Sequence, residues 1–133
     1  MINELVLTVP PLVYVFLGAV LGGAYFTVGL RLSARTGRAW WAAGLVAAAA
    51  LHVVFAFGSG AGAVGLQLIG VAVFAAVARA GMSGRTGWLA AGWLLHPAWD
   101  WALGGTSPEG YVWMCLGFDL VVGAALYLRS VRR

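Results

Sequence analysis

Five long apolar runs, separated by short polar segments, account for almost the whole chain. The runs cover approximately residues 9–31, 39–58, 61–79, 87–104 and 109–129. A helix needs about 20 mostly apolar residues to cross the roughly 30 Å of hydrocarbon in a bilayer, and each run has about that length. The pattern therefore predicts an all-α membrane protein with five transmembrane helices, which form a single domain over residues 1–133.

The composition agrees with this prediction and excludes an ordinary soluble domain. Of the 133 residues, 62% are hydrophobic and only 9% are charged, whereas soluble globular proteins carry about 25% charged residues. The net charge of +4 comes from eight basic residues, all of them arginines that occur in short clusters between the apolar runs. Because these arginines do not form a phosphate-binding face, we expect no nucleic-acid partner.

The positions of the arginines predict the orientation in the membrane. They lie between the first and second runs, between the third and fourth runs, and after the fifth run: Arg31, Arg35, Arg38, Arg79, Arg85, Arg129, Arg132 and Arg133. Short cytoplasmic loops carry the excess of basic residues, so we expect a cytoplasmic C-terminus and an outer N-terminus. The N-terminal segment carries Glu4 and lacks the basic residues of a secretory signal, so we expect the first run to remain as a membrane span.

Two local signals concern the ends and contacts of the helices. Gly18 and Gly22 form a GxxxG motif in the first run, and such small residues let helices approach closely. This motif leaves open either packing within the chain or a homodimer contact. Ser107, Pro108 and Glu109 have the pattern of an N-cap, a first-turn proline and a first-turn acid, which predicts that they open the fifth helix.

Ionisable residues occur in pairs in the fourth and fifth runs. His96 and Asp100 are four residues apart, as are Cys115 and Asp119, and residues at this spacing lie on one helical face. A short turn joins the two runs, so the helices are expected to be antiparallel neighbours, with His96 and Asp119 at similar depth. A single aspartate in mid-membrane costs about 2.5–3.5 kcal/mol on insertion scales. We therefore expect these groups to face one another in the outer half of the bilayer.

Further residues at similar depth are candidates for a substrate pocket around this polar layer. Pro97 removes a backbone donor in the fourth run, which favours a local break and a wet pocket. The candidate substrate-binding residues are Trp93, Trp99, Trp113, Gln67, His52 and Cys115. Trp101 and Tyr111 have positions typical of the aromatic belt at a membrane boundary.

The segments GWLLHPAWDW and YVWMCLGFDL resemble part of a small bacterial integral-membrane family of unknown function, which carries a Gly-Trp-Leu-Leu-His-x-Ala-Trp-Asp segment. The resemblance covers roughly the C-terminal 40 residues. It implies a location in the bacterial plasma (inner) membrane and a site at four residues: His96, Trp99, Asp100 and Asp119. The family pattern has a His-His pair where this chain has Leu103 and Gly104, and the loss of two imidazoles weakens a metal site implied by the resemblance.

The leading functional hypothesis is an enzyme that uses general acid–base chemistry on a lipophilic substrate. A carboxyl group in a low dielectric favours its neutral form, so Asp119, the deeper acid, is expected to donate a proton. Asp100, nearer the interface, is expected to stay ionised beside His96, and these three form the predicted catalytic set. Aromatic rings stabilise cations, which suits cyclisation or isomerisation of an isoprenoid.

The sequence is also compatible with three alternatives to a metal-free enzyme. A metal-assisted enzyme would hold zinc, manganese or iron, although the sequence has no diagnostic ligand motif, and its ligands would be His52, His96, Asp100 and Asp119. A proton-coupled carrier or channel for a small cation would use the same intramembrane acids. In a purely structural role, the polar pairs would only join helices. No other cofactor is expected, and the partners are membrane lipid and a lipophilic small molecule.

Overall fold

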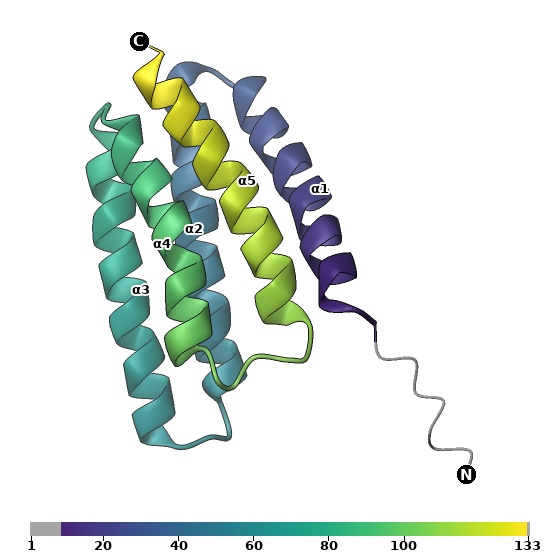
Figure 1. The fold of residues 1–133 in the computed structure, drawn as a ribbon. Helices are drawn as coiled ribbons and strands as arrows, with labels where there is room; N and C mark the ends of the chain where they lie inside the picture. The colour runs from purple at the N-terminus through teal and green to yellow at the C-terminus, as the bar shows by residue number, and fades with distance from the viewer. Residues whose placement is uncertain (1–8, 133) are drawn as a thin grey trace.

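The computed structural model describes residues 9–132, and within this range the chain forms five helices and no strand. The helices are α1 (Pro11–Leu30), α2 (Ala34–Ala56), α3 (Ala61–Met82), α4 (Thr86–Leu103) and α5 (Tyr111–Val131) (Figure 1). The predicted all-helical fold with five helices is therefore confirmed. The expectation about the uncleaved N-terminal segment concerns residues 1–8, which lie outside the described residues.

Four of the five helices, α1, α2, α3 and α5, are long and apolar enough to cross a membrane. The fourth helix, α4, has 18 residues and carries His96, Pro97 and Asp100, which lower its hydropathy. Its polar groups nevertheless point inward, since His96 is 0% and Asp100 is 2% exposed, whereas Leu95 is 59% and Trp101 is 63% exposed. An apolar outer face over a polar interior is what a helix in contact with lipid requires.

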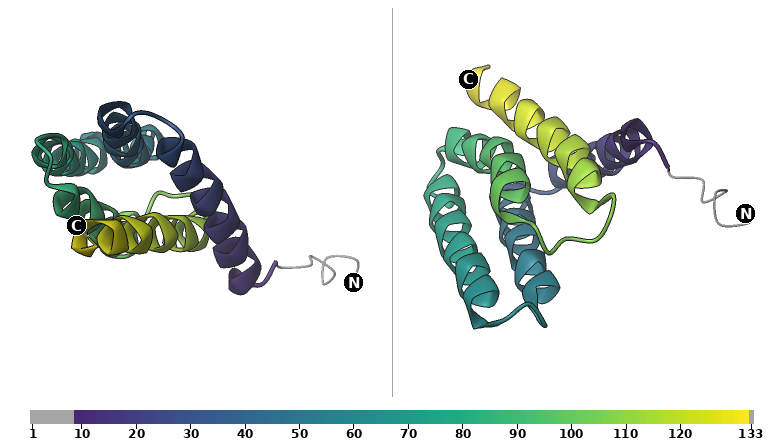
Figure 2. Two further views of the ribbon diagram at one scale, coloured as in Figure 1. Left: turned by 90° about the horizontal axis from the view of Figure 1, so that it is seen from above. Right: turned by 60° about the horizontal axis from the view of Figure 1, so that its bottom comes forward.

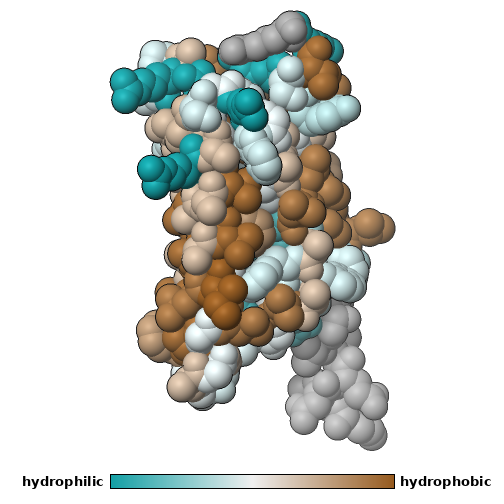
Figure 3. All heavy atoms as spheres, turned by 90° about the vertical axis from the view of Figure 1, so that its left-hand side faces the viewer, coloured by the Kyte–Doolittle hydropathy of each residue, from teal (hydrophilic) through white to brown (hydrophobic). Residues whose placement is uncertain are grey.

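The helices alternate in direction and form a ring in the order α1, α2, α3, α4, α5, in which α1 closes the ring against α5 (Figure 2). The contact between α1 and α5 is extensive, and the contact between α1 and α2 is slight. All described arginines lie at the end of the bundle that contains the C-terminus. Figure 3 shows hydrophilic atoms gathered at this end, above a mainly hydrophobic surface.

Close packing of glycines holds α1 against α5. A Cβ atom on Gly18 would lie 1.8 Å from the carbonyl oxygen of Met114, and one on Gly22 would lie 2.8 Å from that of Phe118. The GxxxG motif therefore serves packing within the chain, which is one of the two roles that the sequence left open. A homodimer remains a prediction, and because Gly18 and Gly22 are both buried against α5, it would need another surface.

The ends of two helices differ from the sequence prediction. α2 begins at Ala34, before the apolar run, because the side chain of Ser33 accepts a hydrogen bond from the backbone N–H of Thr36. α5 begins at Tyr111 after an N-cap at Gly110, which has a φ of 79°, a conformation that glycine adopts without strain. The prediction that Ser107 caps α5 is therefore wrong. The Ser107 hydroxyl lies near His52 Nδ1 instead.

An apolar core fills the half of the bundle nearer the arginine end. Its buried large side chains include Trp41, Leu45, Leu89, Val122 and Leu126, each 3% exposed or less. The indole N–H of Trp93 donates to the carbonyl of Trp41 over 3.2 Å, which ties α4 to α2 at the boundary of this core. This packing fixes α2, α4 and α5 relative to one another, and their other halves carry the polar residues.

Candidate functional site

Four ionisable side chains from three helices meet in the half of the bundle away from the arginines. They are His52 of α2, His96 and Asp100 of α4, and Asp119 of α5, each 2% exposed or less. His96 Nδ1 lies 2.8 Å from Asp119 Oδ2 and 3.4 Å from Asp100 Oδ2, and His52 Nε2 contacts Asp100 Oδ1. The structure therefore joins the predicted catalytic residues and His52 in one cluster, which we call the His/Asp cluster.

The hydrogen bonds order the cluster as two linked His–Asp pairs. His96 Nδ1 is hydrogen-bonded to Asp119 Oδ2, whereas His96 Nε2 is a buried atom without a hydrogen-bond partner among the described residues. His52 is paired with Asp100. A carboxylate that holds one imidazole nitrogen fixes the tautomer and orientation of the ring, which prepares the other nitrogen to take a proton or a ligand.

Ser107 connects this cluster to the α4–α5 loop. Its hydroxyl lies 3.3 Å from His52 Nδ1. Ser107 and Asp100 also line an open groove beside the loop, together with Trp101 and Gly104. A chain of polar contacts thus runs from this groove through His52, Asp100 and His96 to Asp119.

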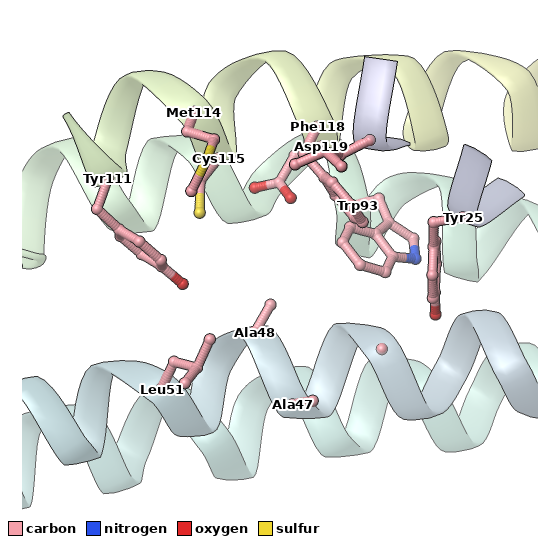
Figure 4. A pocket seen from close by; sticks show the side chains of 12 residues that line it. Tyr25, Ala47, Ala48, Leu51, Trp93, Tyr111, Met114, Cys115, Phe118 and Asp119 are labelled. Atoms are coloured by element: carbon pink, nitrogen blue, oxygen red, sulfur yellow. The ribbon is translucent and has the colours of Figure 1, made fainter. Parts of the chain in front are cut away.

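A cavity of about 290 Å³ lies beside the cluster, between α1, α2, α4 and α5. Figure 4 shows the Asp119 carboxylate directed into it, beside the Cys115 thiol and opposite Ala48. Leu21 and Leu51, which also line the cavity, are 46% and 43% exposed. The cavity therefore opens on the apolar outer surface between α1 and α2.

Three aromatic rings form one wall of this cavity: Tyr25, Trp93 and Phe118. The three ring centroids are 5.3–5.8 Å apart, so each ring contacts the other two. Trp93 was predicted to line a pocket from the sequence, whereas Tyr25 was not. The hydroxyl of Tyr25 donates to the carbonyl of Trp40, and the indole of Trp40 donates back to the carbonyl of Tyr25. This pair closes the cavity toward the arginine end.

The structure places several of the predicted pocket residues elsewhere. Trp99 points away from the cavity toward α3, where a Cβ on Gly70 would lie 2.6 Å from its ring. Its indole N–H donates to Gln67, and the amide nitrogen of Gln67 donates to the carbonyl of Leu103. Gln67 and Trp99 thus hold the end of α4 against α3, and neither side chain lines the cavity or hydrogen-bonds to the His/Asp cluster.

Two further aromatic positions also differ from expectation. Trp113 packs against Trp101, with ring centroids 4.9 Å apart, and does not line the cavity. Tyr111, which was predicted to be a belt residue, lines the cavity and packs edge-on against His52, with a centroid distance of 5.7 Å. Cys115 lies one helical turn from Tyr111 and lines the same cavity, as its spacing from Asp119 suggested.

The cluster also offers a set of metal ligands. His52, His96 and Asp100 each present one ligand atom, and the three atoms lie within 4.8 Å of one another. Asp100 Oδ2 is buried without a hydrogen-bond partner among the described residues. Two imidazoles and one carboxylate with an open fourth position are typical of catalytic zinc sites, so these residues fit such an ion. Asp119, the fourth ligand predicted from the sequence, lies next to this set through its contact with His96.

Comparisons with protein-family models, with curated proteins and with solved structures find no match to this chain. The resemblance to a small bacterial membrane family therefore remains an expectation from the sequence.

Proposed function

We propose that this protein is a membrane-embedded enzyme that transfers protons to and from a lipophilic substrate. The observation that carries the proposal is the position of Asp119, which belongs to a buried chain of His and Asp side chains and also lines an apolar cavity. A carboxyl group at such a boundary can give a proton to a bound molecule and take one back from it. The arginine distribution favours a cytoplasmic arginine end and therefore a cluster in the outer half of the bilayer, and the resemblance to a bacterial membrane family favours the bacterial plasma membrane.

Asp119 is the catalytic group in this proposal, because among the four ionisable residues of the cluster only Asp119 lines the cavity. In its neutral form it gives a proton to one carbon of a C=C bond, which leaves a cation on the other carbon. The resulting carboxylate then removes a proton from a neighbouring carbon, so the double bond moves and the proton balance is zero. His96 is a positioning residue that holds Asp119 and links it to Asp100 and His52.

The cavity supports a substrate that arrives from the lipid phase. Its opening lies between α1 and α2 on an apolar surface, where Leu21 and Leu51 form part of the rim. Its volume of about 290 Å³ is at the lower end of ligand pockets, which range over about 300–1,000 Å³. This size suits a small lipophilic molecule or one segment of a longer chain.

The aromatic wall supports the finer proposal of a cationic intermediate. The faces of Tyr25, Trp93 and Phe118 carry negative electrostatic potential and stabilise a nearby positive charge. Isomerisation or cyclisation of an isoprenoid chain proceeds through such a charge. These reactions are therefore the ones that the cavity fits best.

The experiment is transfer of deuterium from solvent into lipophilic compounds. Membranes that contain the wild-type protein, Asp119→Asn or Glu109→Gln are incubated with lipid extract in D₂O, and the extract is analysed by mass spectrometry. Glu109 is an exposed acid of the α4–α5 loop and serves as the matched control. We expect a labelled compound with wild type and Glu109→Gln, but not with Asp119→Asn. Equal labelling in all three preparations would contradict the proposal.

Metal assistance is tested separately. Elemental analysis of the purified protein compares wild type with His96→Ala, which removes one of the three candidate ligands. A stoichiometric divalent metal in wild type that is lost in His96→Ala would assign the metal-assisted form, in which the ion would polarise the substrate. If neither preparation holds metal, the metal-assisted enzyme is excluded and the metal-free acid–base enzyme is retained.

A proton-coupled carrier is the second candidate, because its acids would also lie in the membrane. A carrier needs polar access from both faces. The polar chain found here leads to the α4–α5 groove, whereas the half toward the arginines is filled by apolar side chains and by the Tyr25–Trp40 pair. This asymmetry favours the enzyme. Proteoliposomes under an imposed pH gradient should accordingly show no cation flux that depends on Asp119.

A further inference from the structure

A small polar notch lies at the arginine end of the bundle, opposite the His/Asp cluster. It has a volume of about 80 Å³ and is formed by the α1–α2 turn, the first residues of α2 and α4, and the end of α5. Arg38, Trp41, Thr86 and Arg129 contribute side chains to it. Neither the acid–base chemistry nor the apolar cavity uses this notch.

Two residues that line the notch carry hydrogen-bond donors without acceptors in the described part of the chain. Arg38 Nε and Trp41 Nε1 are buried atoms with no hydrogen-bond partner among the described residues, and Trp41 as a whole is only 3% exposed. Leaving a buried donor unsatisfied costs about 1–3 kcal/mol, and more for a charged group. A ligand that brings acceptor oxygens would remove this cost.

No carboxylate of residues 9–132 provides a counter-charge in the notch. The carboxylates of the described residues are Asp100, Glu109 and Asp119. Asp100 and Asp119 belong to the His/Asp cluster, Glu109 lies in the α4–α5 loop, and no salt bridge in the described part of the chain involves an arginine. Among residues 9–132, the positive charges of Arg38 and Arg129 therefore have no carboxylate partner, and they can attract an external anion.

Packing keeps the notch open and its donors in place. A Cβ on Gly29 would lie 2.4 Å from Trp41 Nε1, and one on Gly37 would lie 2.6 Å from the carbonyl oxygen of Gly29. Phe26 stacks on the Trp41 ring at 5.2 Å, and the Arg129 guanidinium lies over the same ring, 5.8 Å from its centroid. The indole N–H and the Arg129 charge are thus fixed by the surrounding helices.

We propose that this notch binds a phosphate group, carried either by an anionic phospholipid or by free inorganic phosphate. Its two arginines, its indole N–H and the N-terminus of α2 all offer positive potential or donors, and helix N-termini are established anion sites. The notch volume of about 80 Å³ is the volume that two or three water molecules occupy in the liquid, at roughly 30 Å³ each. This space suits a phosphate group and is too small for a nucleotide. Basic pockets between helices at the cytoplasmic face commonly hold lipid head groups. This inference does not depend on the proposed enzymatic activity.

The test is binding to delipidated protein in a nonionic detergent. Native mass spectrometry measures retention of dioleoylphosphatidylglycerol against dioleoylglycerol, which has the same chains but no phosphate. A thermal-unfolding titration compares inorganic phosphate with chloride at equal ionic strength. The variants are Arg38→Gln, Trp41→Phe and Arg35→Gln, and the last is the matched control, because Arg35 is exposed on the same helix and does not line the notch.

We expect Arg38→Gln to weaken binding of the phosphate-bearing ligand by about tenfold or more, the loss typical of a hydrogen bond to a charged group. Trp41→Phe should weaken it by a smaller factor, because phenylalanine keeps the stacked ring and loses only the N–H. Arg35→Gln should bind as wild type does. An effect with phosphatidylglycerol alone assigns a lipid head group, and an effect with inorganic phosphate assigns the free ion.

The proposal is overturned if Arg38→Gln and Arg35→Gln weaken binding equally, because general charge attraction would then explain it. It is also overturned if neither phosphate ligand binds better than its phosphate-free control. Should Arg38→Gln fail to fold, Trp41→Phe decides between these outcomes: a loss of binding supports the site, and unchanged binding removes it.

Discussion

The two halves of the bundle bury different kinds of side chain on the same helices. Toward the arginine end, α2, α4 and α5 bury Leu45, Leu89 and Leu126, and these close against one another without a charged group. Toward the other end, the same three helices bury His52, His96, Asp100 and Asp119 beside a cavity. Since apolar packing suffices in one half, helix association does not require the polar groups of the other. Their cost in a membrane is better explained by a function.

The largest effect should come from the residue that joins the cluster to the cavity. Asp119→Asn keeps the shape of the side chain and removes its ability to transfer a proton, so deuterium incorporation should fall by about 10²–10⁴-fold, the range of general acid–base catalysis. The helical circular dichroism should stay unchanged. If the variant incorporated deuterium at the wild-type rate, the functional interpretation of this half would be wrong.

The packing of α1 on α5 can be tested next, because α1 contributes Leu21 and Tyr25 to the lining of the cavity. Gly18→Leu should cost about 3 kcal/mol in the free energy of unfolding, since its Cβ would meet the backbone of Met114. Gly23→Leu is the control, because nothing lies within 4 Å of a Cβ at that position. Denaturation of both variants in detergent measures the difference, and equal stability would mean that α1 does not pack on α5 through this face.

A substitution in the apolar half should separate stability from activity. Leu45→Ala leaves a gap next to Gly92, and we expect a loss of about 2 kcal/mol in the free energy of unfolding. This is the low end for leucine substitutions, because lipid is as apolar as the leucine side chain and only packing is lost. Deuterium incorporation by the folded fraction should match wild type. A strong decrease there would show that the two halves are coupled.

The smallest effect is expected at the entrance of the polar chain. Ser107→Ala removes the hydroxyl near His52 Nδ1 and should change the free energy of unfolding by about 1 kcal/mol or less. Proton transfer should slow by no more than about fivefold, because water in the adjacent groove can replace a hydroxyl. Solvent-deuterium kinetics of Ser107→Ala against Ser59→Ala, a serine of the α2–α3 loop, measure this contribution.

The outline of the fold and the centre of the site follow from the sequence, and the reasons are physical. Run length fixed the number of helices, and counting residues from a short turn placed His96 and Asp119 at the same depth, where they are in contact. Position along a helix of known direction is enough for this kind of prediction. His52 was also expected to join the cluster, because its depth matches that of its partners.

Other features of the site depend on how each helix is rotated about its axis and on the path of the loops, which sequence spacing does not determine. Trp99 and Gln67 have suitable depth, but they face the α3–α4 contact and so do not line the cavity. Tyr25 joins the cavity only because α1 packs on α5 and brings its ring to Trp93. Ser107 has the residue type of a helix cap, yet the loop carries it to His52. One signal was available: Gly110 just before the helix favours a later start for α5.

Replacement of the whole polar layer by apolar residues tests directly whether the His/Asp cluster serves proton transfer or helix association. The variant is His52→Leu, His96→Leu, Asp100→Val and Asp119→Val, and the measurement is its free energy of unfolding in detergent beside its deuterium incorporation. Exchange of buried ion pairs for well-packed apolar groups is often neutral or stabilising, so we predict a folded protein at least as stable as wild type and without proton transfer. Loss of the fold, or a large decrease in stability, would contradict the account and assign the His/Asp cluster a structural role.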